Sequence, residues 1–193
     1  MKNDALTQIL YALKLRGSVY FHTCFSPPWA VRVPAFGDVA RFHMAMRGGC
    51  WLAVDGVDKP IRLATGDLAV IPHGAAHILS DEPGRPAAEV DEVVRQSGYT
   101  GEGALYYGGP DEELACKLFC GHFEFEEGSV HPLLDALPSV IHLPNTQTMN
   151  AFWLEAVMRF VASEVRAGQP GSEAIIHRLT EIIFIQVVRT FVD

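Results

Sequence analysis

The sequence predicts a mainly β fold that ends in an antiparallel pair of helices. From Ser18 to about Leu143, short runs of apolar, aromatic and β-branched residues are separated by Gly, Pro or Asp at strand-length intervals. Many short strands of this kind favour a sandwich or barrel over a sheet of alternating strands and helices. From Met149 onward, apolar residues recur every three or four positions, which indicates amphipathic helices.

Seven runs are predicted as strands: SVYFHTCF, ARFHMAM, CWLAVDG, IRLATGDLAVIP, HILSD, CKLFCGHFEF and VIHL. The third and fourth are joined through Asp55-Gly56, a dipeptide typical of hairpin turns. Residues 80–113 are polar, rich in Gly and Pro, and long for a connection, with one or two helical turns expected around residues 88–96. Such stretches are functional lids or partly disordered insertions, and the sequence leaves both alternatives open.

Two helices are expected after the strands. The first covers residues 149–167 and ends at the breakers of 168–171, and the second begins at a Ser172 cap and runs to the end of the chain. The IIFIQVV run at 182–188 is apolar almost all round, so a β-strand is the alternative there. Length and the cap favour a helix.

Composition limits the function. The formal net charge of −8, with no local basic cluster, makes the chain by itself a poor binder of nucleic acid. The sequence has no apolar run long enough for a transmembrane helix, and the first 17 residues predict a short amphipathic helix instead of a signal peptide. The expected compartment is the cytoplasm, where the four cysteines stay reduced.

The stretch GDLAVIPHGAAH places Gly66, Pro72, Gly74 and His77 at a recognisable spacing. It resembles the second motif of the cupin superfamily, in which the final His binds a metal inside a small barrel. The Asn usually found four residues after that His is absent, because position 81 is Asp81.

The first cupin motif is expected one hairpin earlier in the chain. Aligning it on residues 47–48 puts the usual metal-binding Glu near Arg41 and the two usual His positions within 34–37, where none is a ligand. His43 remains as a candidate, on the same strand face as Arg41. The resemblance to a metal-dependent cupin enzyme therefore fails at the residues that carry the chemistry.

A narrower resemblance covers nearly the whole chain. RGSVYF, PPWAVRVP, FHMAMRGGCWLAVDG, LATGDLAVIPHGAAHIL, LFCGHFEF, HPLLDALPSVIHL and the terminal helices resemble the AraC-type regulators whose amino-terminal half is a cupin effector domain. This resemblance implies a cupin barrel (a double-stranded β-helix or jelly roll) over 1–146, with the insertion at 80–113, and a helical dimerisation segment over 147–193. Its relatives continue into a DNA-reading helix-turn-helix domain, which nothing in this chain supplies.

Candidate site residues follow from the motifs and from strand alternation. A cluster of His43, His77 and Cys120 would supply three ligands for Zn²⁺, with His122 as a weaker fourth. The candidate contacts to a small-molecule effector are His43, His77, His73 and Trp51. Each has a structural alternative: core histidines bonded to backbone, a polar turn residue at His73, and a core aromatic at Trp51.

Three functions are weighed. The leading one is an effector-sensing, dimerising domain of an AraC-type regulator, which is not an enzyme and reaches DNA only through a helix-turn-helix domain outside this chain. The alternative is a cupin metalloenzyme, a small oxygenase or isomerase, and the third is a cupin-fold dimer that has lost both ligand and metal. The sequence contains no nucleophile elbow, P-loop or H-E-x-x-H motif.

A homodimer through the C-terminal helices is expected, because a helix apolar on every side has more than one face to cover. The competing account covers the apolar stripe within the chain or with the missing DNA-binding half. Under the dimer hypothesis, Ile183→Glu or Val187→Glu dissociates the dimer and leaves the barrel folded.

Overall fold

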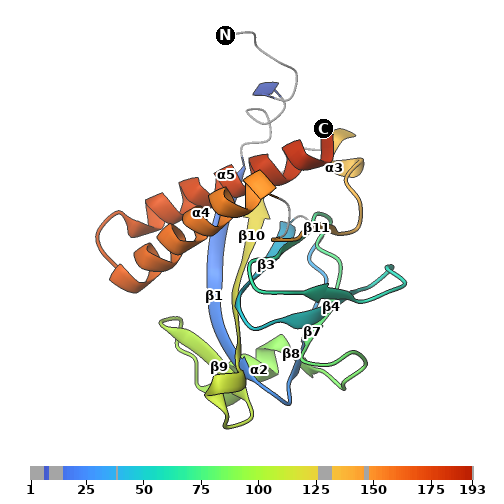
Figure 1. Ribbon diagram of the computed structural model, residues 1–193, viewed down its shortest axis with the longest axis vertical. Helices are drawn as coiled ribbons and strands as arrows, with labels where there is room; N and C mark the ends of the chain where they lie inside the picture. Colours follow the sequence, from blue (N-terminus) through green and yellow to red (C-terminus); the bar gives the residue numbers. More distant parts are fainter. Residues whose placement is uncertain (1–6, 9–14, 38, 126–131, 146–147, 193) are drawn as a thin grey trace.

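The computed structural model describes residues 7–8, 15–37, 39–125, 132–145 and 148–192. Two β-sheets pack face to face, and two long C-terminal helices lie across the outer face of the larger sheet (Figure 1). Most of the predicted N-terminal helix falls outside the described residues. None of the described helices is both long enough and apolar enough to span a membrane.

The larger sheet has six strands in the order β11-β6-β3-β10-β1-β9. Their bounds are β11 Ile141–Leu143, β6 Leu68–Ile71, β3 Val39–Arg47, β10 Cys116–Glu124, β1 Arg16–Ser26 and β9 Ala104–Gly108. The smaller sheet has five strands, β5 Ile61–Leu63, β4 Cys50–Val54, β7 His77–Ser80, β2 Ala30–Val33 and β8 Ala88–Glu89, in the order given. Neighbouring strands are antiparallel except β1 with β9 and β2 with β8.

The predicted strands are confirmed, and the predicted barrel takes the form of a sandwich. Within the described residues, the pairings form two separate sheets and do not close into one barrel. The run IRLATGDLAVIP divides into β5 and β6 at Gly66, whose φ of 89° makes the turn. The hairpin through Asp55-Gly56 pairs β4 with β5. The short strands β2, β8 and β9 were not predicted.

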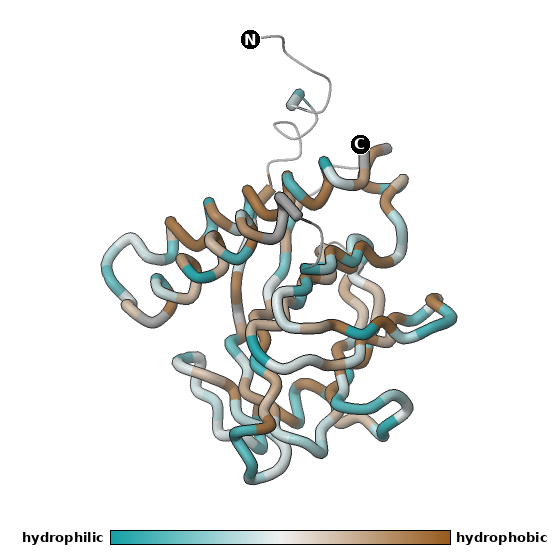
Figure 2. The backbone as a smooth tube through the Cα atoms, viewed as in Figure 1, coloured by the Kyte–Doolittle hydropathy of each residue, from teal (hydrophilic) through white to brown (hydrophobic). Residues whose placement is uncertain are grey.

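Alternation along the central strands creates two separate cores. On β3, Phe42 and Met44 point toward the helices, while His43 and Ala45 point between the sheets. The inner core fills the space between the sheets. The outer core lies between the six-stranded sheet and the helices α4 (Thr148–Ala167) and α5 (Ser172–Val192). Figure 2 shows hydrophobic positions interspersed with hydrophilic ones along both helices.

The IIFIQVV run is part of α5, so the helix prediction is confirmed and the strand alternative is wrong. Four of its side chains are buried against the sheet within this chain: Ile183, Phe184, Val187 and Val188. The expectation that Ile183 and Val187 face a second chain is therefore corrected. They are core residues, because they lie on the face of α5 that packs on the six-stranded sheet.

Smaller elements complete the fold. Residues 80–113 contain α2 (Val90–Ser97), which confirms the expected helical turns, and they also contribute β8 and β9. A 3₁₀ turn at Glu112–Leu114 leads into β10, and α3 (Pro132–Asp135) precedes β11.

Candidate functional site

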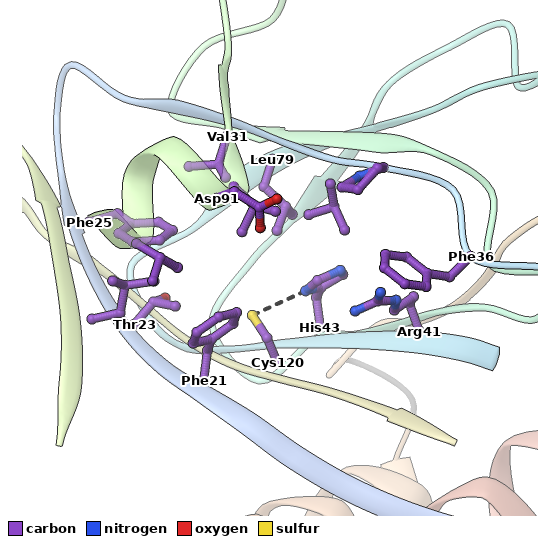
Figure 3. A pocket seen from close by; sticks show the side chains of 15 residues that line it. Phe21, Thr23, Phe25, Val31, Phe36, Arg41, His43, Leu79, Asp91 and Cys120 are labelled. Carbon is purple, nitrogen blue, oxygen red and sulfur yellow. Dashed lines mark hydrogen bonds between the residues drawn. The ribbon is translucent and has the colours of Figure 1, made fainter. Parts of the chain in front are cut away.

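An apolar cavity of about 280 Å³ lies between the two sheets (Figure 3). One wall comes from the six-stranded sheet: Phe21, Thr23 and Phe25 of β1, Arg41 and His43 of β3, and Cys120 of β10. The opposite wall comes from β2, β7 and α2. The volume is close to the lower end of the range for small-molecule sites, about 300–1,000 Å³.

Strand register explains why these side chains meet. Cys120 is paired with Phe21 on one side and with His43 on the other, so the three form one row across the sheet. Side chains on a strand return to the same face every second residue. Thr23 and Arg41 therefore lie on the same inner face, one step to either side of that row.

The sheets are joined through a chain of three buried polar side chains, called here the Cys120–His43–His77 chain. His43 Nδ1 lies 3.1 Å from Cys120 Sγ, and His43 Nε2 lies 2.7 Å from His77 Nε2. His77 Nδ1 lies 2.9 Å from the Ala75 carbonyl oxygen. His43 comes from one sheet and His77 from the other, so the contact crosses the core.

Burial determines the charge state of the Cys120–His43–His77 chain. Desolvation lowers the pKa of His43 well below its usual range, and the neighbouring His77 and Arg41 lower it further. Desolvation also lowers the pKa of His77 to about 4 and raises the pKa of the Cys120 thiol. All three groups are therefore neutral at pH 7.

With neutral rings, only one arrangement of protons satisfies every contact. The Ala75 carbonyl accepts only, so His77 Nδ1–H donates to it and His77 Nε2 is an acceptor. His43 Nε2–H then donates to His77, which leaves His43 Nδ1 to accept from the Cys120 thiol. The hydrogen-bond network thus assigns one tautomer to each histidine.

The glycine-rich motif positions both His77 and the mouth of the cavity. Gly74 has a φ of 60°, and a Cβ there would overlap the Phe36 carbonyl. The Phe36 N–H donates to the Gly74 carbonyl at 2.9 Å, which fixes the 34–37 segment against the turn. The Phe36 ring then lies 4.5 Å from the Arg41 guanidinium carbon. The motif spacing therefore serves the turn as well as the histidine.

A metal does not fit the three side chains as they lie. His43 directs its two ring nitrogens to different partners, so His77 and Cys120 do not converge with it on one point. Two imidazole nitrogens on a tetrahedral Zn²⁺ would lie about 3.3 Å apart, wider than the contact observed. Within the described residues, no group of three or more His, Cys, Asp or Glu side chains is placed to hold a metal ion.

His77 contacts His43 but is not itself among the residues that line the cavity, so the prediction that both histidines point into it holds for His43 alone. The other candidate residues lie away from the cavity. His122 faces the same side of β10 as Cys120, but it contacts Glu124 at 2.8 Å. His73 is exposed in the turn, where its Nε2–H donates to the Leu137 carbonyl. Trp51 lies on the face of β4 opposite the buried residues, with the Arg62 guanidinium over its ring. It is not among the residues that line the cavity.

Sequence reasoning did not single out Thr23 or α2 as parts of the site. Thr23 lies between Phe21 and Phe25 at alternate positions of β1, and a polar residue within such an apolar series was the available signal. Val90, Asp91 and Val94 of α2 line the cavity, which favours the lid alternative for residues 80–113.

Comparison with known proteins agrees with the fold and the motifs. A family model described as Cupin matches residues 4–193. An AraC-like transcription regulator of Streptomyces lividans is 27% identical over 98% of this chain and 60% of its own length. The HTH-type transcriptional regulator AlkR of Acinetobacter baylyi is 29% identical over 96% of this chain and 60% of its own length.

A third relative, the HTH-type transcriptional regulator MtrA of Neisseria gonorrhoeae, is 22% identical over 98% of this chain and 59% of its own length. The chain thus spans about 60% of the length of the curated relatives it matches. The resemblance stated from the sequence is confirmed, and the chain belongs to the cupin family, with AraC-like transcription regulators as its relatives.

Proposed function

We propose that this chain is the ligand-sensing and dimerisation part of an AraC-like transcription regulator and has no enzymatic activity. The observation that carries the proposal is the apolar cavity between the sheets, with a few polar groups on its walls. Cavities of this composition bind small molecules that are apolar with a small number of polar substituents. The names of the relatives support a regulatory role.

Strand β1 connects the cavity with the helices. Its residues Phe21, Thr23 and Phe25 line the cavity, and α5 packs directly on the same strand. A Cβ at Gly17 of β1 would meet Thr180 of α5, so the two backbones approach closely there. A ligand that binds better to one arrangement of β1 and α5 would bias the arrangement of the helices.

The helices carry an apolar surface suited to a second copy of the chain. Phe152 is 80% exposed and Phe160 is 48% exposed, and the two lie on one face of α4 because they are eight residues apart. On α5, Ile175 and Ile182 are exposed with a spacing of seven residues. A pair of helices running antiparallel, joined by residues 168–171, would present both stripes to a partner.

The net charge of −8 supports the assignment of DNA binding to a domain of the regulator other than this one. An acidic domain is repelled by phosphate backbones. DNA contact would then belong to a helix-turn-helix domain outside these residues, and the effector and the partner copy would belong to this one.

Propylbenzene, an apolar probe, tests the cavity. Methyl NMR spectra should show shifts at Val31, Leu79 and Leu105 on titration, and none at Ile183 or Val187 of the outer core. In Val94→Trp, the indole should fill the cavity and abolish these shifts. Shifts confined to the outer core, or no shifts in the native protein, contradict the proposal.

Light scattering tests the dimer. At micromolar concentration the native chain should have twice the monomer mass of 21.2 kDa. Phe152→Ser combined with Ile182→Ser should return the mass to that of the monomer. Leu114→Ser, at a residue that is 66% exposed but outside the two helices, is the matched control and should stay dimeric. A monomeric native chain ends the dimer proposal.

Metal analysis of protein purified without chelator or a nickel column separates the sensor from the alternative metalloenzyme. Stoichiometric iron or manganese would favour a small oxygenase or isomerase. The hydrogen-bonded chain, in which His43 directs its two ring nitrogens to different partners, supports the sensor. Zinc at these residues would require His43 to give up one of its two contacts.

A further inference from the structure

The hydroxyl of Thr23 is buried in the wall of the cavity and is unpaired. Thr23 is 2% exposed, and none of the described residues provides a hydrogen-bond partner for its Oγ1. The residue lines the cavity, and Figure 3 shows it at the opposite end from Arg41. Leaving a buried hydroxyl unpaired costs free energy, so such a group needs a physical explanation.

A trapped water is a poor explanation at this position. On the inner face of the sheet, the four positions around Thr23 are all apolar. They are Phe21 and Phe25 along β1, Leu118 opposite on β10 and Leu105 opposite on β9. A buried water needs two to four polar partners, and beside these neighbours it would find the hydroxyl alone.

The other uncharged polar groups on the cavity wall already have partners. The Cys120 thiol donates to His43 Nδ1 at 3.1 Å, and His43 Nε2–H donates to His77 at 2.7 Å. A ligand group that bonded to Cys120 or His43 would therefore break an existing hydrogen bond. Thr23 can gain a hydrogen bond from a ligand without losing one.

A charged ligand group is disfavoured beside Thr23. The charged residues that line the cavity are Arg41, at the far end in Figure 3, and Asp91, which is exposed on α2. A charge beside Thr23 would lie among the four apolar neighbours, with one hydroxyl in place of the water that it leaves. Burying an unpaired charge costs far more than burying a neutral polar group. The group that lies against Thr23 is therefore uncharged.

The Thr23 hydroxyl matches an acceptor that brings no proton of its own. A threonine hydroxyl has one proton to donate and lone pairs that accept. A ligand carbonyl accepts this proton, and no donor is then left unpaired. A ligand hydroxyl facing Thr23 also makes one hydrogen bond, but one of the two protons stays unpaired in apolar surroundings, which costs free energy. A carbonyl is therefore the better partner.

On the basis of the proposed function, we infer that the effector is an uncharged apolar molecule with a carbonyl group, a ketone, aldehyde or ester, to whose oxygen the Thr23 hydroxyl donates. The rest of the molecule contacts the apolar side chains of both sheets and of α2. A cavity of about 280 Å³ suits an aromatic or short aliphatic body.

Three probes that differ at a single carbon test this contact. Propylbenzene has a methylene there, propiophenone a carbonyl and 1-phenylpropan-1-ol a hydroxyl. Titration of the methyl resonances of Leu79 and Leu105 gives the dissociation constant of each probe. The quantity compared between variants is the ratio of the dissociation constants of hydrocarbon and ketone. The hydration of the free probes is the same for every variant and cancels in this comparison.

In Thr23→Val, this ratio should fall about tenfold from its native value, because the carbonyl loses its donor in apolar surroundings. Thr23→Ser keeps a hydroxyl and should stay within about twofold of the native ratio. Thr180→Val, which removes a buried hydroxyl on α5, is the matched control and should leave the ratio unchanged. An unchanged ratio in Thr23→Val overturns the inference, and so does a fall in Cys120→Ala in its place.

The alcohol tests the choice of a carbonyl. The native chain should bind propiophenone about fivefold more tightly than 1-phenylpropan-1-ol, since the alcohol brings a proton that finds no acceptor. Tighter binding of the alcohol overturns the assignment of a carbonyl.

Failure of this inference is distinct from failure of the proposed function. If propylbenzene shifts the cavity methyls but Thr23→Val leaves the ratio at its native value, the carbonyl contact is wrong and the sensing cavity stands. If neither propylbenzene nor propiophenone shifts the cavity methyls, both are overturned.

Discussion

The two faces of the six-stranded sheet are made by the same strands and have different chemistry. On the outer face, Phe42 of β3 and Phe123 of β10 pack with their ring centres 4.9 Å apart, and Phe184 of α5 packs on Phe123 at 5.0 Å. On the inner face, the same two strands present His43 and Cys120 to the cavity. One residue of offset along a strand separates the two environments.

This difference separates the residues that stabilise the fold from those that line the cavity of the proposed binding site. The outer core is apolar apart from Thr180 of α5, whose hydroxyl donates to the Ile176 carbonyl, whereas the space between the sheets holds two neutral histidines and a hydroxyl without a partner. Buried polar groups stabilise less than apolar side chains of similar shape when they are not fully hydrogen-bonded. Substitutions on the outer face should therefore destabilise the protein strongly, and some on the inner face should stabilise it.

The largest effect is expected for Ile183→Glu. Ile183 is 1% exposed in the outer core, and a carboxylate there has no partner. We expect a loss of more than about 4 kcal/mol in the free energy of unfolding, measured by urea denaturation. The neighbouring Ile182→Glu, at a residue that is 41% exposed in the single chain, should change it by less than about 0.5 kcal/mol when both variants are measured at a concentration low enough for the protein to be monomeric. Equal losses of stability in the two variants would contradict the assignment of Ile183 to the buried side of α5 and Ile182 to its exposed side.

The next effect is a decrease in the free energy of unfolding at acidic pH, caused by the two histidines buried between the sheets. His43 and His77 have folded-state pKa values below their usual range, to about 4 for His77, so below pH 6.5 the unfolded chain binds more protons than the folded one. Their contribution is present above pH 6.5 and is lost as the pH falls toward 4. For His77 alone, the free energy of unfolding lost between pH 6.5 and its folded-state pKa is about 3 kcal/mol.

Urea denaturation between pH 7 and 4.5 measures this loss. Combining His43→Leu with His77→Leu should flatten the profile between pH 6.5 and 5, because the titrating groups are gone. The control His177→Gln, on α5, should keep the slope of the native protein. An unchanged slope in the double variant would falsify the assignment of the acid sensitivity to the inner face.

The smallest effect has the opposite sign. Thr23→Val keeps the shape of the side chain and removes the unpaired hydroxyl, so the ligand-free protein should gain about 1 kcal/mol. Calorimetry should show a melting temperature higher by about 2–4 °C. Thr180→Val is the matched control, because this buried threonine donates to the Ile176 carbonyl and should gain nothing. Destabilisation in Thr23→Val would show that its hydroxyl has a partner.

Local patterns in the sequence were sufficient to predict most of the elements. Alternation predicted the long strands β1, β3 and β10, and three- and four-residue periodicity predicted α4 and α5. These predictions succeed because each depends on the geometry of a single strand or helix. The cluster of His43, His77 and Cys120 came from the resemblance to the cupin and AraC-type motifs together with strand alternation, and the three side chains lie in contact, while their role as ligands or effector contacts stays a prediction.

Tertiary structure decided the features that depend on pairing between distant segments. Cys120 and His43 are 77 residues apart, and the register of β10 on β3 brings them side by side. Because of this placement the Cys120 sulfur contacts the His43 ring directly, and the two do not converge on a common metal position. The side of α5 that is buried, and the absence of a partner for Thr23 Oγ1, depend equally on neighbours from other elements. A residue pattern determines which face a side chain takes, but what lies opposite that face is determined by the packing of the whole chain.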